Sequence, residues 1–215
     1  MIIVNFKTYQ NAVGPAAVEL AKIHEVVAKE TGVDIGIAVD ALDLAKVAEV
    51  VSIPVFAQHV DAADFGSFTG GIVPEVVKAL GAVGTLLNHS EKRLGEKLPA
   101  CIAAAKRAGL VIILCAETAE EAEKFVEYSP EYIAVEPPEL IGGDISVTSA
   151  NPAIIEESVK RIGDCQLLVG AGVKNGKDVA TAMKLGAKGV LLASGVTKAS
   201  NPAEVLRDLA SGLKV

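Results

Sequence analysis

The chain alternates eight times between a short apolar run and a longer segment whose apolar residues recur at helical spacing, and this alternation limits the fold more than any other feature. Short apolar runs bounded by turn residues are typical of buried strands, whereas spacings of three and four are typical of helices. Strands that alternate with helices form right-handed βαβ units and therefore a parallel sheet. The predicted strands are Ile2–Phe6, Asp34–Val39, Pro54–Gln58, Val83–Leu87, Leu110–Cys115, Tyr132–Val135, Gln166–Gly170 and Gly189–Leu192. The predicted helices are Pro15–Glu30, Leu42–Val51, Pro74–Leu80, Leu98–Ala108, Ala119–Val126, Pro152–Ile162, Gly176–Leu185 and Pro202–Ser211, with Asn151 and Asn201 as N-caps of two of them.

Eight such units in about 200 residues is the number that closes a (β/α)8 barrel. The sequence therefore predicts the α/β class and a single barrel domain over residues 1–215. An open, doubly wound sheet is the alternative architecture. It usually has fewer strands and a glycine-rich fingerprint after the first strand, where this chain has Asn5-Phe6-Lys7.

Composition excludes several classes of function. Hydrophobic residues make up 51% of the chain, yet no apolar run approaches the roughly 18 residues of a membrane span. A net charge of −7 argues against nucleic-acid binding, although a local site can still hold an anionic substrate. The three scattered cysteines and the lack of a basic leader before the first strand predict reduced thiols and a cytoplasmic protein.

Glu136 stands at the end of the sixth predicted strand, and a stiff Pro137-Pro138 pair follows it. The segment then continues through apolar Leu140 and Ile141 to Gly142-Gly143. A carboxylate followed by a stiff hinge and a loop with an apolar tip suggests a catalytic base beneath a mobile lid. The alternative is a solvated carboxylate at a strand–loop junction.

The ends of the first and fourth strands carry further candidates, because barrel enzymes place their chemistry at the carboxyl ends of strands. Lys7, two residues after Asn5, could stabilise an oxyanion or hold a phosphate, or it could be a surface lysine. His89 begins the segment after the fourth strand. It could donate a hydrogen bond as a neutral imidazole at a helix N-terminus, or it could simply cap that helix. We expect Arg93 to pair with Glu91 or to be solvated.

The loops after the seventh and eighth strands are small and glycine-rich: Val169-Gly-Ala-Gly172 and Leu192-Ala-Ser-Gly195. Exposed backbone N–H groups in such loops can bind a phosphate, and barrels commonly place one there. Tight turns alone would also explain the small residues. His24, within the first predicted helix, is expected on the surface. We find no metal-ligand spacing among His, Cys, Asp and Glu, so neither a metal nor another cofactor is expected.

A carboxylate, an imidazole, an ammonium and a phosphate cup together predict proton abstraction beside a carbonyl. Glu136 would remove the C–H proton, and His89 and Lys7 would stabilise the enediolate. An aldolase would be expected to carry a Schiff-base lysine in place of Glu136. A sugar-phosphate epimerase would want paired aspartates and a metal. A non-catalytic barrel that binds a sugar phosphate is the remaining alternative.

Five motifs in this order resemble the triosephosphate isomerase family over nearly the whole chain. They are Asn5-Phe-Lys7, His89-Ser-Glu91-Lys-Arg93, Ala134-Val-Glu-Pro-Pro-Glu-Leu-Ile-Gly142, Gly170-Ala-Gly-Val173 and Leu192-Ala-Ser-Gly195. The short chain and the Pro-Pro lid are similar to the archaeal branch. The lid lacks the family's frequent tryptophan, and His59 follows Gln58 where an Asn is usual at an interface.

The resemblance implies a TIM barrel that interconverts dihydroxyacetone phosphate and glyceraldehyde 3-phosphate, in glycolysis and gluconeogenesis, without a cofactor. It assigns the general base to Glu136, the electrophile to His89 and substrate contacts to Asn5 and Lys7. It further implies that the substrate's phosphate lies on backbone N–H groups around Ile141, Gly142, Gly172, Ala193 and Ser194. Gly66–Gly71 is similar to the loop that enters a partner subunit, so a homodimer or homotetramer is expected.

Overall fold

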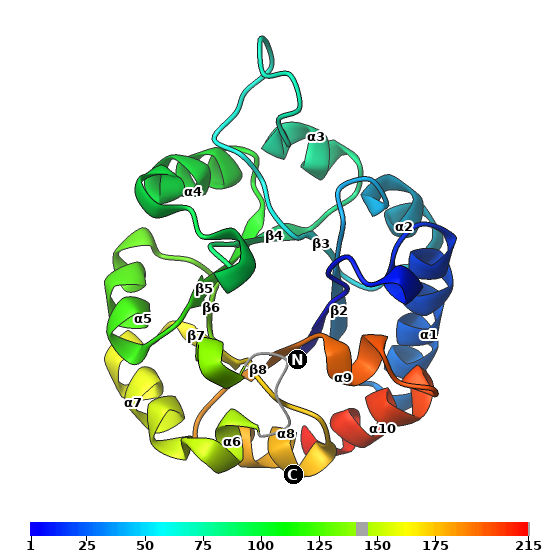
Figure 1. Ribbon diagram of the computed structural model, residues 1–215, viewed down its shortest axis with the longest axis vertical. Helices are drawn as coiled ribbons and strands as arrows, with labels where there is room; N and C mark the ends of the chain where they lie inside the picture. The colour runs from blue at the N-terminus through cyan, green and yellow to red at the C-terminus, as the bar shows by residue number, and fades with distance from the viewer. Residues whose placement is uncertain (141–145, 215) are drawn as a thin grey trace.

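Eight parallel strands close into a barrel in the order β1 to β8 in this computed structural model, which describes residues 1–140 and 146–214. The first strand pairs on one side with β2, through Ile2 and Ile35, and on the other with β8, through Ile2 and Val190. The predicted barrel is therefore confirmed, and the open sheet is excluded because the sheet has no free edge. Figure 1 looks down the barrel and shows the helices as a ring around the strands.

The observed elements agree with the predicted ones to within two residues at each end. The strands are β1 (Ile2–Asn5), β2 (Ile35–Val39), β3 (Val55–Ala57), β4 (Gly84–Leu87), β5 (Val111–Ala116), β6 (Tyr132–Val135), β7 (Gln166–Val169) and β8 (Gly189–Leu192). The helices are α1 (Pro15–Thr31), α2 (Leu44–Val50), α3 (Pro74–Ala79), α4 (Leu98–Arg107), α5 (Ala119–Phe125), α6 (Val147–Ala150), α7 (Pro152–Ile162), α8 (Gly176–Lys184), α9 (Ser194–Thr197) and α10 (Pro202–Gly212). The short helices α6 and α9, of four residues each, were not predicted because they hold barely one turn.

The strands are buried on both faces, and their alternating side chains make two cores. In β1, Ile3 points into the barrel, whereas Ile2 and Val4 pack against the helices. Phe56 is a large side chain inside the barrel, and glycine stands beside it on β4. A Cβ at Gly84 would lie 2.8 Å from the Phe56 ring and 2.3 Å from a backbone oxygen of β5. The interior is therefore a packed core, and only the strand ends are left to form a site.

The two predicted asparagine caps differ in the structure. Asn201 caps α10 as expected, because its side-chain oxygen accepts the N–H of Glu204 at 3.3 Å. Asn151 precedes α7 but makes no side-chain capping bond. Its own N–H instead donates to the carbonyl of Val147 and ends α6. Asn151 therefore occupies the predicted N-cap position of α7, but its side chain does not make the capping bond.

The segment between β3 and α3 projects from the ring of helices (Figure 1). It carries two exposed aromatic side chains, Phe65 and Phe68, which are 71% and 49% accessible. No helix among the described residues combines the length and the apolar character needed to cross a bilayer.

His24 is fully buried, so its predicted surface position is wrong. It lies on the face of α1 that packs on the barrel, with its ring centroid 5.2 Å from that of Phe6. One ring nitrogen, Nδ1, bonds the carbonyl oxygen of Leu20 at 2.7 Å. The other, Nε2, is buried and has no hydrogen-bond partner within the described part of the chain. Burial lowers the pKa of His24 to about 4 because the charged imidazolium cannot be hydrated there.

We expect His24 to make the fold sensitive to acid. In the unfolded chain His24 becomes protonated below pH 6.5. In the folded chain it becomes protonated only when the pH approaches its lowered pKa of about 4. The stabilisation is therefore complete above pH 6.5 and is lost as the pH falls towards 4, by about 3 kcal/mol. Urea denaturation from pH 7 to 4.5 should show a shallower loss of unfolding free energy for His24→Leu than for the wild type. Parallel curves would contradict this role.

Candidate active site

One cavity at the carboxyl ends of the strands gathers most of the residues predicted to form the site. Its lining combines the chemically active candidates with the small residues of the last two loops: Asn5, Lys7, His89, Glu136, Gly172, Ala193 and Ser194. Strands β1, β4, β6, β7 and β8 lead into these positions, which the parallel barrel brings to one rim. Ile141 and Gly142 lie outside the described residues.

Glu136 follows β6 directly and is 7% exposed. Its N–H donates to the carbonyl of Ala116 at 2.9 Å and so continues the ladder between β5 and β6 for one more bond. Burial raises the pKa of its carboxyl group to about 7, while the ammonium of Lys7 and the thiol of Cys115 work in the opposite direction. Among the described residues, its Oε2 atom has no hydrogen-bond partner. Glu136 is thus a desolvated carboxylate with one free oxygen.

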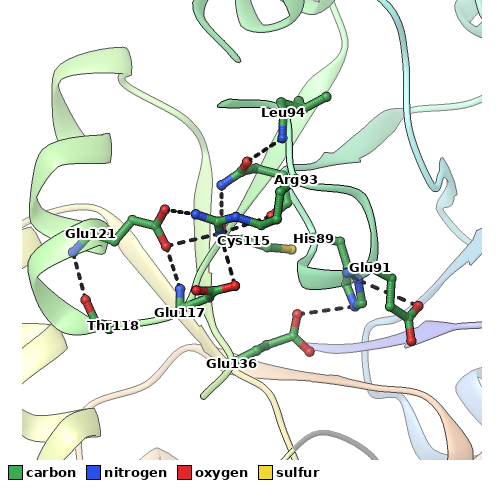
Figure 2. Close-up of polar contacts among 10 residues, drawn as sticks. His89, Glu91, Arg93, Leu94, Cys115, Glu117, Thr118, Glu121 and Glu136 are labelled. Carbon is green, nitrogen blue, oxygen red and sulfur yellow. Dashed lines mark hydrogen bonds and ion pairs between the residues drawn. The ribbon is translucent and has the colours of Figure 1, made fainter. Parts of the chain in front are cut away.

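His89 is the N-cap residue of the 3-10 turn η2 (Ser90–Lys92). Its Nδ1 accepts the N–H of Glu91 at 3.1 Å, so a neutral ring carries its proton on Nε2. Burial, and secondly the charge of Lys7, lower the pKa of His89 to about 4. The Nε2 atom lies 3.6 Å from Oε2 of Glu136, and Figure 2 shows the two side chains facing each other. The capping interpretation is confirmed, and capping through Nδ1 leaves Nε2–H available as a donor.

Lys7 is held in the left-handed region, at φ 48°. Its N–H donates to Oδ1 of Asn5 at 3.0 Å, and its carbonyl accepts from Nε2 of Gln58 at 3.0 Å. These two bonds fix the backbone from which the lysine side chain extends. The ammonium lies 2.7 Å from Oε1 of Glu91. Lys7 is therefore an anchored cation at the rim.

The two glycine-rich loops line the same cavity. Ala171 and Gly172 both have positive φ, 69° and 73°, which turns their backbone towards the site. The short helix α9 begins at Ser194, and the first N–H groups of a helix have no partner within it. These donors suit an anion that is small enough to lie between the loops.

Several neighbours of these residues were not among the predicted catalytic or substrate-binding residues, and Gly170 was predicted only as part of a phosphate loop. Gly170 leaves the space that Glu136 fills, since a Cβ there would lie 2.2 Å from Cγ of Glu136. Tyr9 lines the cavity. Gln58 and Cys115 were noted only as strand-end residues. That position was the one sequence signal available for them, because their contacts join distant parts of the chain.

Other polar residues near the rim have local partners. Arg93 pairs with Glu121 and lies 3.8 Å from Glu117, whereas we expected it to pair with Glu91 or to be solvated. Figure 2 shows this guanidinium pointing away from the His89 ring and towards α5. His59 bonds the carboxylate of Asp61 at 2.9 Å. Within the two described ranges, no three His, Cys, Asp or Glu side chains gather closely enough to hold a metal ion.

The fold and the site together define a barrel enzyme equipped for acid–base chemistry on an anionic substrate. A buried carboxylate with a pKa of about 7 suits a base, a neutral imidazole suits a donor to oxygen, and an ammonium suits developing negative charge.

Comparison with known proteins agrees with this class. The family model for triosephosphate isomerase matches residues 1–209. A triosephosphate isomerase of Methanocaldococcus jannaschii is 46% identical over 97% of this chain and 98% of its own length. One from Metallosphaera sedula is 44% identical over 99% of this chain and 95% of its own length. The chain belongs to the triosephosphate isomerase family and is an isomerase.

The fold of a solved relative is also similar. The crystal structure of triosephosphate isomerase from Bartonella henselae superposes with a TM-score of 0.77, covering 100% of this chain and 98% of the other. At 21% identity this likeness supports the barrel alone.

We expect Gly170→Ala to displace Glu136, because the new methyl group and the present Cγ cannot occupy the same space. A displacement of roughly 1 Å at a reacting group costs on the order of a hundredfold in rate. Isomerase activity and a crystal structure of the variant would test this. Thermal unfolding of Gly170→Ala, Glu136→Ala and the double variant supplies the control. The glycine change should destabilise less when Glu136 is already truncated, and strictly additive effects would contradict the steric explanation.

Proposed function

We propose that this chain interconverts dihydroxyacetone phosphate and D-glyceraldehyde 3-phosphate through an enediolate. The observation that carries the proposal is the pairing in one cavity of two buried groups. Oε2 of Glu136 and the proton-bearing Nε2 of His89 lie 3.6 Å apart, with the Lys7 ammonium on the same lining. Proton transfer between adjacent carbons of a small substrate needs a base and an oxygen-directed donor within this reach.

In the proposed reaction, the Glu136 carboxylate takes a proton from the carbon beside the substrate carbonyl. The electron pair moves into the new carbon–carbon double bond, and the carbonyl oxygen gains negative charge. Nε2–H of His89 and the ammonium of Lys7 stabilise that oxygen. The former carbonyl oxygen takes the Nε2 proton of His89, and the ring recovers a proton from the neighbouring hydroxyl oxygen, which becomes the new carbonyl oxygen. Glu136 then returns its proton to the former carbonyl carbon, so the reaction consumes nothing. Asn5 acts by holding the backbone at Lys7.

The protonation states support this division of roles. A base whose pKa is about 7 is partly ionised at neutral pH and is strong enough to attract a proton. An imidazole whose pKa is about 4 is neutral at pH 7, and its single proton on Nε2 can be donated to the substrate oxygen.

Gly172, Ala193 and Ser194 support a phosphate site in the same cavity as the base. Their backbone lies at a positive-φ turn and at the start of α9, where N–H groups face an anion without a side-chain charge. The part predicted for Ile141 and Gly142 remains a prediction.

A coupled assay with glyceraldehyde 3-phosphate tests the reaction and the base together. We expect turnover by the wild type with chelator present. Glu136→Asp should lose on the order of a hundredfold or more in kcat, because the shorter arm withdraws the base by about one methylene. Inhibition by inorganic phosphate should change little, because the phosphate loops are untouched. His89→Gln should lower kcat mainly, as it removes a donor but no phosphate contact.

Two outcomes would reject parts of this proposal. Unchanged kcat in Glu136→Asp would remove Glu136 as the base. Binding of the triose phosphate by folded wild-type protein without any turnover would favour a sugar-phosphate binding barrel.

We also propose that the protein is a cytoplasmic homo-oligomer, either a dimer or a tetramer. The projecting segment between β3 and α3 exposes Phe65 and Phe68, two large apolar side chains that solvent disfavours. The three cysteines are free thiols, which fits a reducing compartment.

The double change Phe65→Ser and Phe68→Ser should shift the protein towards the monomer, because it removes the apolar area available to a second copy. Light scattering after gel filtration measures the mass. Val26→Ser on α1 is a matched control, since Val26 is 50% exposed but lies outside the projecting segment. A wild-type monomer, or an unchanged oligomer in the double variant, would contradict this assembly.

A further inference from the structure

Asn88 occupies a position that strains its backbone. It directly follows β4, is 3% exposed, and has a φ of 61°, in the left-handed region. Glycine adopts this region without steric cost, whereas asparagine tolerates it less well. A buried asparagine in place of glycine therefore suggests that its side chain contributes something that compensates for the strain.

The carboxamide of Asn88 uses both of its ends. Nδ2 donates to the carbonyl oxygen of Cys115 on β5 at 3.2 Å. Oδ1 accepts the N–H of Leu94 at 3.0 Å and thereby closes the turn that carries η2. Because all three groups are at least partly shielded from water, these bonds specify the local geometry strongly.

The Cys115 bond extends the sheet at the point where β4 stops. The last paired residues of these two strands are Leu87 and Leu114. One residue further along, the side-chain N–H of Asn88 donates to the Cys115 carbonyl, which a backbone N–H would otherwise bind in a continuing ladder. On the other edge of β5, the N–H of Glu136 donates to the carbonyl of Ala116 at 2.9 Å. The end of β5 is thus a spacer with the His89 segment bound on one edge and the Glu136 segment on the other.

Two further contacts reinforce this spacer. The Cys115 thiol also acts on the Glu136 carboxylate, where it works to lower the pKa against the larger effect of burial. Arg93 reaches the carbonyl of Asn88 at 3.5 Å while it is paired with Glu121. The backbone at Asn88 is therefore held from β5, from α5 and from its own turn.

We propose that Asn88 is a positioning residue, which sets the distance between Nε2 of His89 and the Glu136 carboxylate by binding the β4 end to β5. Asn88 is not among the described residues that line the cavity. The inference rests on the proposed function in assigning His89 and Glu136 their roles, but the geometry it predicts can be measured without turnover.

Asn88→Gly tests the amide without adding strain, because glycine accepts a φ of 61° freely. We expect kcat to fall about tenfold to a hundredfold with KM changed less than about twofold, since only the relation of base to donor is altered. Asn88→Ala should show the same loss of kcat together with a lower Tm, because alanine lacks the amide and is also strained. Ser129→Gly is the matched control: Ser129 has a φ of 45° after the 3-10 turn η4 (Val126–Tyr128), outside the site lining, so kcat should be unchanged.

A crystal structure of Asn88→Gly gives the second readout. The separation of 3.6 Å between His89 and Glu136 should change by on the order of 1 Å. Wild-type kcat in Asn88→Gly, with a loss confined to Asn88→Ala, would overturn the proposal, as would an unmoved pair in the crystal. If wild-type protein shows no isomerisation, the proposed function fails, while the structural comparison still decides whether Asn88 fixes the pair.

Discussion

The burial of the Glu136 carboxylate is the constraint on which the rest of the site depends. Removing water raises its pKa to about 7, and the Lys7 ammonium partly offsets this effect. The same dry surroundings lower the pKa of His89 to about 4. One physical cause, desolvation, thus moves the two groups in opposite directions and makes a usable base beside a neutral donor. A carboxylate in this place also needs an empty volume, which explains why residue 170 carries no side chain.

The closed parallel barrel supplies this buried environment without leaving unpaired backbone groups at a sheet edge. Hydrogen bonding around the full circle leaves no sheet edge to solvate, and Phe56 with its neighbouring glycines fills the interior. Groups at the strand ends therefore sit above a rigid, apolar floor. Small extensions of the ladder, such as the bond from Glu136 to Ala116, then place side chains with the precision of the sheet itself.

The sequence predicted the barrel well because the signal for each element is local. A short apolar run marks each strand, and apolar residues spaced three and four apart mark each helix. It also predicted which side chains meet at one rim, since strand-end positions follow once the barrel is assumed. His24 was misplaced although the signal existed: it lies on the same buried face of α1 as Ala17, Leu20 and Val27. Gly170 and Asn88 could not be assigned, because their roles come from contacts with Glu136 and Cys115 that only the folded chain creates.

The ion pair between Lys7 and Glu91 shows how the site can be both stable without substrate and open to it. The lysine side chain is 12% exposed, whereas that of Glu91 is 58% exposed. An ion pair with one well-hydrated partner is worth at most about 1 kcal/mol. The pair therefore keeps the ammonium at the rim, but the free energy needed to break it is small. An arriving anion can take the place of the Glu91 carboxylate, and water can rehydrate that carboxylate at once. Lys7 can thus engage a substrate without an uncompensated buried charge at any stage.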